Sequence, residues 1–312
     1  MSAAAQVNAD LPVTAAGKER RQHPTPAAVA PLRHRRTQFE FTDVPRYWAD
    51  GDAFFSRFID ALSINFPDGE RFFMDSVRRF EKQVQDPKLL EDIRTFIRQE
   101  AQHGFAHEQF NAHIQAQGVR ADRVVKILKK QKAWAQRKLS PKWQLAFTAA
   151  AEHLTATLGE GMLELMPERL RTAHPEMRAL YFWHAVEEVE HKAVAFDTYR
   201  QATDGGYTER AVAMVVFTLW LHVKVAEIMT HAFRVDGISG DRTMIARGIW
   251  NLYGPRGFLT RLLPRYLAWF KPGFHPFDTT LPPLAQAWID EYEKHHDPIR
   301  ACAVAYGERP AL

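Results

Sequence analysis

Two Glu-x-x-His units constrain this chain more than any other feature, because each directs a carboxylate and an imidazole to one side of a helix. The units are Glu100-x-x-His103 and Glu188-x-x-His191, and both lie in segments with helical periodicity. At about 100° per residue, His184 also falls within roughly 60° of Glu188 and His191. Paired units of this kind on separate helices are typical of carboxylate-bridged dinuclear metal sites in helical bundles. We therefore expect a bundle built around such a centre.

The rest of the chain also favours an all-α fold. Apolar residues recur at intervals of three and four, and alternating strand patterns are nearly absent. Pro67-Asp68-Gly69 interrupts the first helical pattern, so proline there either kinks a helix or starts a new one. Asp86-Pro87 is a typical helix start, and Gly118 is a typical helix end. The expected helices cover about residues 52–66, 70–84, 87–117, 126–138, 142–166, 175–200, 211–233 and 283–295.

Composition divides the chain into three parts. Residues 1–40 are basic and rich in Ala and Pro, which predicts a disordered tail; a transit peptide is the alternative interpretation. We expect the metal-binding bundle at 45–235 and a helical, aromatic-rich extension at 236–312 that packs on it. Much of the net charge of +4 lies in the tail, so nucleic-acid binding is not expected. The single cysteine, Cys302, excludes an internal disulfide and fits a cytoplasmic protein.

Each of four expected helices offers one carboxylate to the centre. Bridging carboxylates cancel the repulsion between two divalent ions, and four buried carboxylates without cations would be very costly to keep ionised. Glu160 is the alternative to Glu152, and Glu81 is the alternative to Glu70, which lies close to the proline. The expected ligands are Glu70, Glu100, His103, Glu152, His184, Glu188 and His191.

Three further side chains have the spacing of supporting residues. His107 lies one helical turn beyond His103, and we expect it to hydrogen-bond a ligand rather than bind metal. Glu227 and His231 are four residues apart on the apolar helix at 211–233, where hydrogen bonding to a ligand or between helices is favoured over a further metal-binding pair. That helix is expected to be buried, because His222 and Lys224 shorten its apolar run below the length of a membrane span.

Two resemblances bear on these residues. The segments 66–73, 100–103 and 183–191 resemble the bacterial family of predicted metal-dependent hydrolases, over about residues 45–300. The pattern His184-x-x-x-Glu188-x-x-His191 is similar to the p-aminobenzoate N-oxygenase family and its haem-oxygenase-like di-iron relatives. The resemblances imply a ferritin-like or haem-oxygenase-like bundle. The second also implies that His184 is a metal ligand.

These observations favour a non-haem di-iron or di-manganese enzyme that uses dioxygen to oxidise a small organic substrate. Sites rich in carboxylates suit iron or manganese, whereas hydrolytic zinc sites more often have three nitrogen or sulfur ligands. We expect two iron ions, with manganese or zinc as alternatives, and no catalytic group beyond the ligands. One alternative function is hydrolysis by a water activated at the dinuclear metal site. The second is ferritin-like handling of iron or peroxide, which the long aromatic C-terminal region disfavours.

Residues 245–277 alternate aromatic side chains with Arg, Gly and Pro. The favoured interpretation is a strap that closes one side of the bundle. The alternatives are the wall of an apolar substrate pocket and a peripheral membrane contact with Arg256, Arg261 and Arg265 at the lipid headgroups. The expected partners are an apolar small molecule, together with dioxygen and an electron donor if the chemistry is oxidative. A homodimer is compatible with the sequence.

Overall fold

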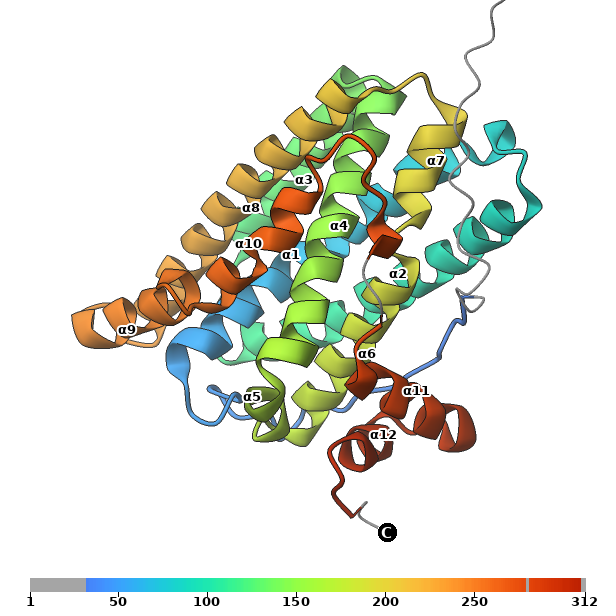
Figure 1. Ribbon diagram of the computed structural model, residues 1–312. Coiled ribbons are helices and arrows are strands. Elements are labelled where there is room, and N and C mark those ends of the chain that lie inside the picture. Colours follow the sequence, from blue (N-terminus) through green and yellow to red (C-terminus); the bar gives the residue numbers. More distant parts are fainter. Residues whose placement is uncertain (1–31, 279–280, 310–312) are drawn as a thin grey trace, which may run out of the picture. The chain divides into compact units, whose positions relative to one another are not determined.

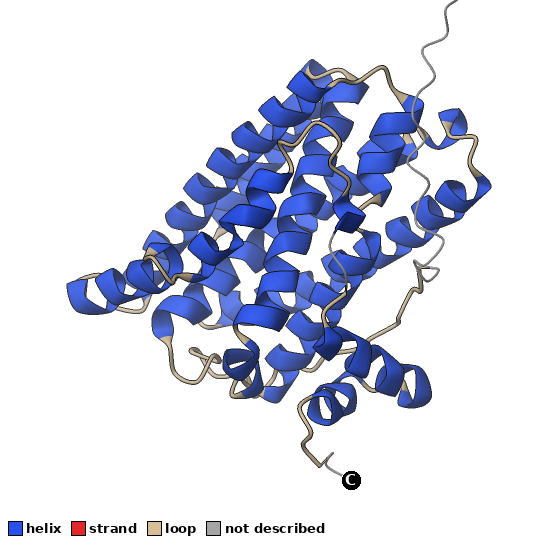
Figure 2. Cartoon of the chain, viewed as in Figure 1, coloured by secondary structure: helices blue, strands red, loops and turns tan. Residues whose placement is uncertain are grey.

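The structure, a computed structural model, describes residues 32–278 and 281–309. These residues form helices and loops and contain no β-strand, which confirms the all-α prediction (Figure 2). Short 3₁₀ turns lie at Glu81–Gln83 and Pro276–Asp278. The α-helices are α1 (Ala53–Arg78), α2 (Pro87–Ala116), α3 (Asp122–Lys138), α4 (Pro141–Leu165), α5 (Pro167–Arg171), α6 (Pro175–His191), α7 (Val194–Ala202), α8 (Tyr207–Val235), α9 (Arg242–Tyr253), α10 (Phe258–Ala268), α11 (Pro283–His295) and α12 (Pro298–Ala305).

The helix ends follow from local sequence. Asp52, Asp86 and Ser140 accept hydrogen bonds from backbone N–H groups in the first turns of α1, α2 and α4. Proline follows directly after Asp86 and Ser140, at a position where no helical N–H partner is needed. Gly118, with a φ of 97°, turns the chain after α2.

Four long helices, α1, α2, α4 and α6, pack on one another in the body of the bundle (Figure 1). α1 packs on α2, α2 on α6, α6 on α4, and α4 on α1. Gly159 lets α4 approach α6 closely, since a β-carbon there would lie 3.2 Å from the backbone of Ala185. α8 covers α4 and α1, and α9 and α10 pack on α1 and α4.

Pro67 does not divide the first helix. α1 continues through it to Arg78, although proline has no N–H to donate to the carbonyl of Ser63. The side chain of Asn111 on α2 donates to that carbonyl instead, at 3.0 Å. Glu70 therefore lies inside a long helix rather than at a helix start.

Two other expected elements differ from the structure. The helix expected over 175–200 is broken after His191, and α7 restarts at Val194. The basic segment that we assigned to a disordered tail is ordered in part. Arg35, Phe39 and Phe41 are buried, so that prediction is wrong for residues 32–40. Residues 1–31 of the expected tail lie outside the described residues.

α8 is less buried than its sequence predicts. It is long and apolar enough to cross a membrane by length and composition, and 39% of its most apolar window is buried. One side packs in the core through Met214, Val225 and Ile228. The other side exposes Leu219 and Val223 by more than 60%. The prediction of a buried helix is wrong for this outer side.

Candidate metal centre

The structure brings the seven expected ligands together between α1, α2, α4 and α6. All seven residues are buried, and each is at most 6% exposed. The i to i+3 spacing on α2 and the i, i+4, i+7 spacing on α6 direct these side chains towards the same interior. The seven are Glu70 on α1, Glu100 and His103 on α2, Glu152 on α4, and His184, Glu188 and His191 on α6.

Their donor atoms form overlapping groups. Glu70, His103 and His184 make one group whose atoms lie within 4.8 Å of one another. Other groups of the same size are Glu100 with His103 and Glu188, and Glu100 with Glu152 and His191. Glu100 and His103 each belong to two groups. The arrangement therefore offers two adjacent positions for cations, with Glu100 between them.

Close approaches between charged groups define the two ends of the site. His191 Nε2 lies 3.2 Å from both Glu100 Oε1 and Glu152 Oε2. At the other end, His184 Nε2 lies 3.3 Å from Glu188 Oε1, and His103 Nδ1 lies 3.6 Å from the same oxygen. Gly104 leaves room for the remaining carboxylate, because a β-carbon there would lie 3.1 Å from Glu70 Oε2.

Many of these buried atoms make no hydrogen bond with any described residue. They include both carboxylate oxygens of Glu70, Glu100 and Glu152, together with His103 Nδ1 and His191 Nε2. An unsatisfied buried polar group costs about 1–3 kcal/mol, and a charged group costs more. Cations satisfy buried acceptors that converge on one region and have no hydrogen-bond donor. The residues present therefore fit a dinuclear metal centre.

Hydrogen bonds on the far side of each imidazole fix its orientation. His103 Nε2 bonds Glu187 Oε2 at 3.1 Å, and His191 Nδ1 bonds Gln99 Oε1 at 3.1 Å. Because both partners are acceptors at these atoms, each imidazole is the donor. The second nitrogen of His103 and of His191 then presents its lone pair to the centre, as a metal ligand requires.

His184 is held in a different way. Its Nδ1 bonds His107 Nε2 at 2.9 Å, and Ser63 Oγ lies 2.9 Å from His107 Nδ1. Phe66 stacks on the His184 ring with centroids 5.1 Å apart. His184 Nε2 consequently faces Glu188, and His107 is placed as a hydrogen-bonding partner rather than at the centre itself.

The electrostatics of the site also favour cations. Burial, reinforced by the charge of Glu100, raises the pKa of Glu70 well above its usual range and that of Glu152 to about 8. Burial opposes ionisation of Glu188 as well, but His191 and His103 hold its pKa well below the usual range. Without cations, Glu70 and Glu152 can remain buried only by holding protons.

The N-terminal segment supports the centre from outside. The backbone N–H of Arg35 donates to Glu187 Oε1 at 3.2 Å, and its guanidinium binds Glu190 at 2.7 and 2.8 Å. Glu187 thus connects residues 32–44 to the ligand His103. We did not identify Arg35, Gln99 or Glu187 from the sequence. For Glu187 a signal was present, since it lies four residues before His191 and three after His184.

Other predicted residues lie elsewhere. Glu227 pairs with Lys224 on α8, and within the described part of the chain no hydrogen bond or ion pair joins Glu227 or His231 to the seven ligands. Neither supports the centre as expected. The alternative carboxylates are also engaged: Glu160 binds Lys192 at 2.7 Å, and Glu81 binds Arg94.

Changing Glu187 to Gln is expected to lower metal affinity about 10- to 100-fold, because a weaker acceptor then holds His103. Chelator competition on the purified protein measures this loss. Glu190→Gln is the matched control, since Glu190 contacts Arg35 but makes no hydrogen bond to His103. Equal losses of metal affinity in the two variants would show that the contact with Arg35, rather than the hydrogen bond to His103, determines the affinity.

An apolar cavity of about 480 Å³ lies one side chain away from this centre. Phe66, which stacks on His184, lines it, as does Thr155, whose hydroxyl donates to Glu188 Oε2. Its other walls come from α3 and α8, including Ala135 and Phe217. The cavity therefore offers space for an apolar molecule beside the ligands.

Comparison with known proteins gives one match. The model of a family described as "Predicted metal-dependent hydrolase" matches residues 33–280. No curated protein and no solved structure matches the chain. The match confirms the first resemblance, and it favours the hydrolytic alternative over the oxidative function that we expected first. The resemblance to p-aminobenzoate N-oxygenase and its relatives stays a prediction.

Proposed function

The chain belongs to the family of predicted metal-dependent hydrolases, and from this membership we propose that it is a dinuclear metal-dependent enzyme acting on a largely apolar substrate. One observation carries the proposal: two overlapping donor groups share Glu100, and both carboxylate oxygens of Glu70, Glu100 and Glu152 are buried without hydrogen-bond donors. Glu70, His103 and His184 would hold one ion, and Glu152 and His191 would hold the other. Glu100 and Glu188 lie between them.

The cavity beside the centre supports an apolar substrate. Its walls are almost entirely hydrocarbon and aromatic surface, so they bind by excluding water rather than by hydrogen bonding. Phe66 separates His184 from the cavity, and the Thr155 hydroxyl holds Glu188 in place. A substrate in the cavity would therefore contact Phe66 and Thr155, each of which touches a ligand.

Hydrolysis is the reaction that family membership favours. Two bound divalent ions supply Lewis-acid activation of water or, if they are redox-active, reduction of dioxygen. Oxidation by dioxygen is the second candidate, and the donor set favours it. Four carboxylates and three imidazoles without a thiolate suit iron or manganese better than zinc. We propose iron or manganese as the native metal.

Metal loading separates these alternatives. The full-length protein is stripped with a chelator, loaded anaerobically with ferrous iron, manganese or zinc, and its ions are counted. We expect two ions per chain. Turnover of p-nitrophenyl esters that improves with acyl length supports hydrolysis, and dioxygen uptake with an added reductant supports oxidation. Binding of one ion or none would refute the dinuclear proposal.

Filling the cavity tests whether it binds substrate. Changing Ala135 to Trp places an indole in the cavity wall, and we expect KM for a long-chain substrate to rise about 10-fold or more while the ion count is unchanged. Ala133→Trp is the matched control, because Ala133 is exposed on the same helix and does not line this cavity. An unchanged KM in Ala135→Trp would place the substrate elsewhere.

A further inference from the structure

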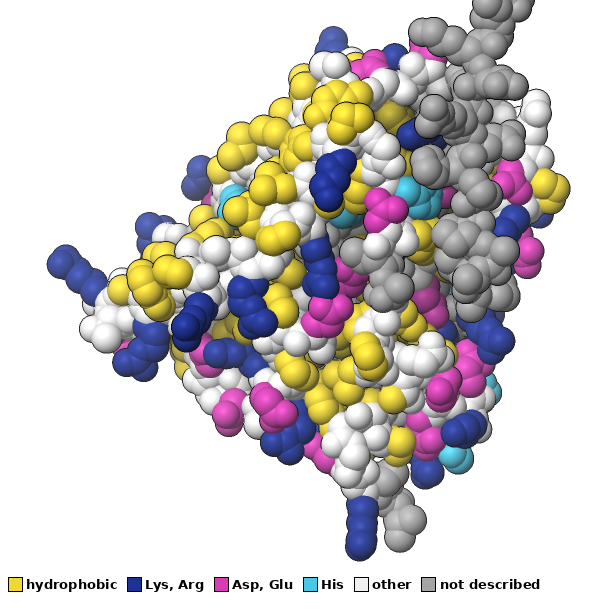
Figure 3. Space-filling view, viewed as in Figure 1, with side chains coloured by type: hydrophobic (Ala, Val, Ile, Leu, Met, Phe, Trp, Pro, Cys, Tyr) yellow, Lys and Arg dark blue, Asp and Glu magenta, His cyan; other side chains and the backbone are white. Residues whose placement is uncertain are grey.

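One surface of the protein carries many exposed apolar side chains. Hydrophobic side chains gather over α8, α9 and α10 (Figure 3). Leu219 on α8 is 63% exposed and Trp250 on α9 is 65% exposed. We call this surface the α8–α10 face. Its exposed apolar members are Val212, Val215, Val216, Leu219, Val223, Ile249, Trp250, Tyr253, Leu263 and Leu267.

The exposed members on α8 form a continuous stripe. Positions 212, 215, 216, 219 and 223 recur at three and four residues, so they lie on one side of the helix. The opposite side of α8 packs on α4 and α1. Large contiguous apolar patches on a protein surface mark interaction sites. The α8–α10 face is therefore a candidate interaction surface.

Charge on the same elements indicates what this surface binds. Residues 242–277 contain five arginines and one lysine but no Asp or Glu, and residues 210–226 of α8 contain no carboxylate either. Arg242, Arg247, Arg256 and Arg261 make no ion pair with any residue that the structure describes. A surface with an apolar centre and unpaired cations at its margins is complementary to a bilayer that carries anionic headgroups.

We propose that the α8–α10 face docks on the surface of an anionic phospholipid bilayer, with α8 lying along the membrane rather than across it. Spanning would require lipid around the side of α8 that carries Met214 and Ile228, and that side is buried against the bundle. A second copy of the chain is disfavoured, because a two-fold interface would place the unpaired arginines of one copy against those of the other. Trp250 and Tyr253 are side chains that prefer the lipid–water boundary.

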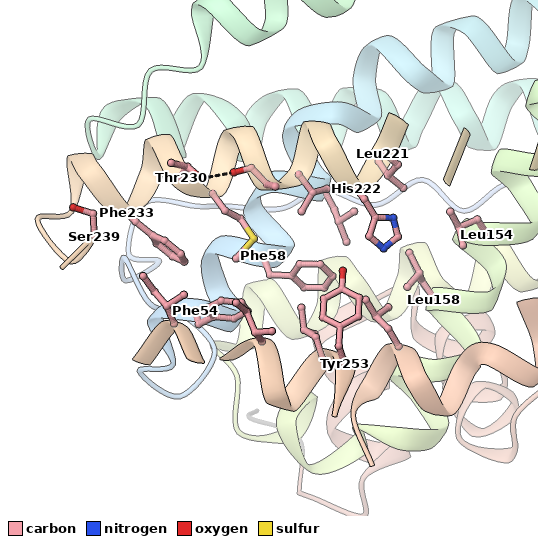
Figure 4. Close-up of a pocket in the computed structure, with 18 residues that line it drawn as sticks. Phe54, Phe58, Leu154, Leu158, Leu221, His222, Thr230, Phe233, Ser239 and Tyr253 are labelled. Carbon is pink, nitrogen blue, oxygen red and sulfur yellow. Dashed lines mark hydrogen bonds between the residues drawn. The ribbon is translucent and has the colours of Figure 1, made fainter. Parts of the chain in front are cut away.

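A cavity at this face supports the proposal. About 420 Å³ of apolar space lies between α8 and α9, with Phe54, Phe58 and Leu158 among its inner walls (Figure 4). His222 and Tyr253, which are exposed, line the same cavity. Docking would therefore bring acyl chains against an apolar space that is long enough to accept part of one.

Vesicle co-sedimentation of the full-length protein tests the proposal without any assay of activity. We expect binding to phosphatidylcholine vesicles that contain phosphatidylglycerol, little binding to pure phosphatidylcholine, and loss of binding at high salt. The double variant Arg256→Gln/Arg261→Gln should weaken binding about fivefold for each charge removed. Leu219→Asp should weaken it as well, whereas Phe105→Asp, at an exposed apolar position on α2, should not.

The basic N-terminal tail is the main competing source of membrane affinity. Arg20→Gln/Arg21→Gln removes the same charge from the tail and should leave most of the binding intact. If only the tail variant loses binding, the face is not the docking site. Equal binding to neutral and anionic vesicles would also overturn the proposal. So would a dimer in light scattering that Leu219→Asp dissociates, in the absence of vesicle binding.

Discussion

Changing Glu100 to Gln is expected to abolish the binding of both metal ions. Glu100 belongs to both the group with His103 and the group with Glu152, so its loss removes a ligand from each position. Losing a hydrogen-bonding partner outside the coordination sphere already lowers metal affinity about 10- to 100-fold. The loss of a shared ligand should exceed this. Ion counts after loading and chelator competition measure the change.

The same substitution should also change the protonation of the metal-free protein. The charge of Glu100 contributes to the raised pKa of Glu70 and Glu152, which means that it repels both carboxylates. Removing that charge should lower the pKa of Glu152, which carboxyl titration by NMR measures. With metal at about 1,000 times Kd, each bound ion stabilises the wild type by about 4 kcal/mol, roughly 10 °C in Tm, and the variant gains nothing.

Two further variants define this result. Glu152→Gln should lose the ion at the His191 end and retain the other, because Glu152 belongs to one donor group. Glu108→Gln changes an exposed carboxylate on the same helix and should leave both the ion count and Tm unchanged. If Glu100→Gln retains two ions, Glu100 is not shared between them. If the pKa of Glu152 does not fall in its metal-free form, the carboxylates do not repel one another as described.

The sequence predicts those parts of the site that depend on spacing within one helix. Glu188 and His191 share a helix face for any packing of the bundle, and so do Glu100 and His103. The choice of Glu152 over Glu160 depends on how α4 is rotated, which the close packing of Gly159 on α6 determines. The sequence therefore favours Glu152 as the ligand but does not exclude Glu160.

Contacts between distant residues explain the remaining differences. Glu70 looked doubtful because Pro67 removes a helical hydrogen bond, and the compensating donor, Asn111, lies 48 residues after the carbonyl of Ser63. Arg35 lies in a segment with the composition of a disordered tail, yet it is buried by its bonds to Glu187 and Glu190, about 150 residues away. Composition and periodicity carry no information about such partners.

The α8 helix shows a different limit of periodicity. Its sequence is apolar on nearly all sides, which favours burial, but the bundle covers only one side. Whether a second layer covers an apolar helix depends on the other elements available. α9 and α10 face α8 across an apolar cavity and add exposed side chains of their own. The sequence predicted that α8 is a core helix because so many of its residues are apolar. The apolar residues that the bundle leaves exposed are those from which we infer membrane docking.

Raising the pH from about 6.5 to about 8 is expected to destabilise the metal-free protein and to stabilise the metal-loaded protein. Stability falls with rising pH wherever the folded state holds more protons than the unfolded chain. Glu152 holds its proton up to a pKa of about 8, whereas an unfolded Glu loses it near 4.3. Contacts with Glu100 and Glu188 raise the pKa of His103 against the effect of burial, and contacts with Glu188 and Glu152 do the same for His191. Above pH 6.5 both imidazoles therefore also hold protons in the folded state that the unfolded chain loses, which lowers stability as the pH rises.

The other groups of the centre with shifted pKa values do not offset this loss of stability between about pH 6.5 and about pH 8. Burial lowers the pKa of His107 and His184, so these rings affect stability only below about pH 6.5. The lowered pKa of Glu188 matters only below about pH 4.5. Each extra proton in the folded state costs up to about 1.4 kcal/mol per pH unit.

Bound metal reverses the trend because ions displace these protons and bind more tightly as the ligands deprotonate. Tm with a chelator should therefore fall across the window, while Tm with excess metal should hold or rise, and Glu152→Gln should flatten the chelator series. Parallel curves with and without metal would mean that the titrating groups lie outside the centre. A divergence that Glu152→Gln reduces would place the titrating protons on the same residues that hold the ions.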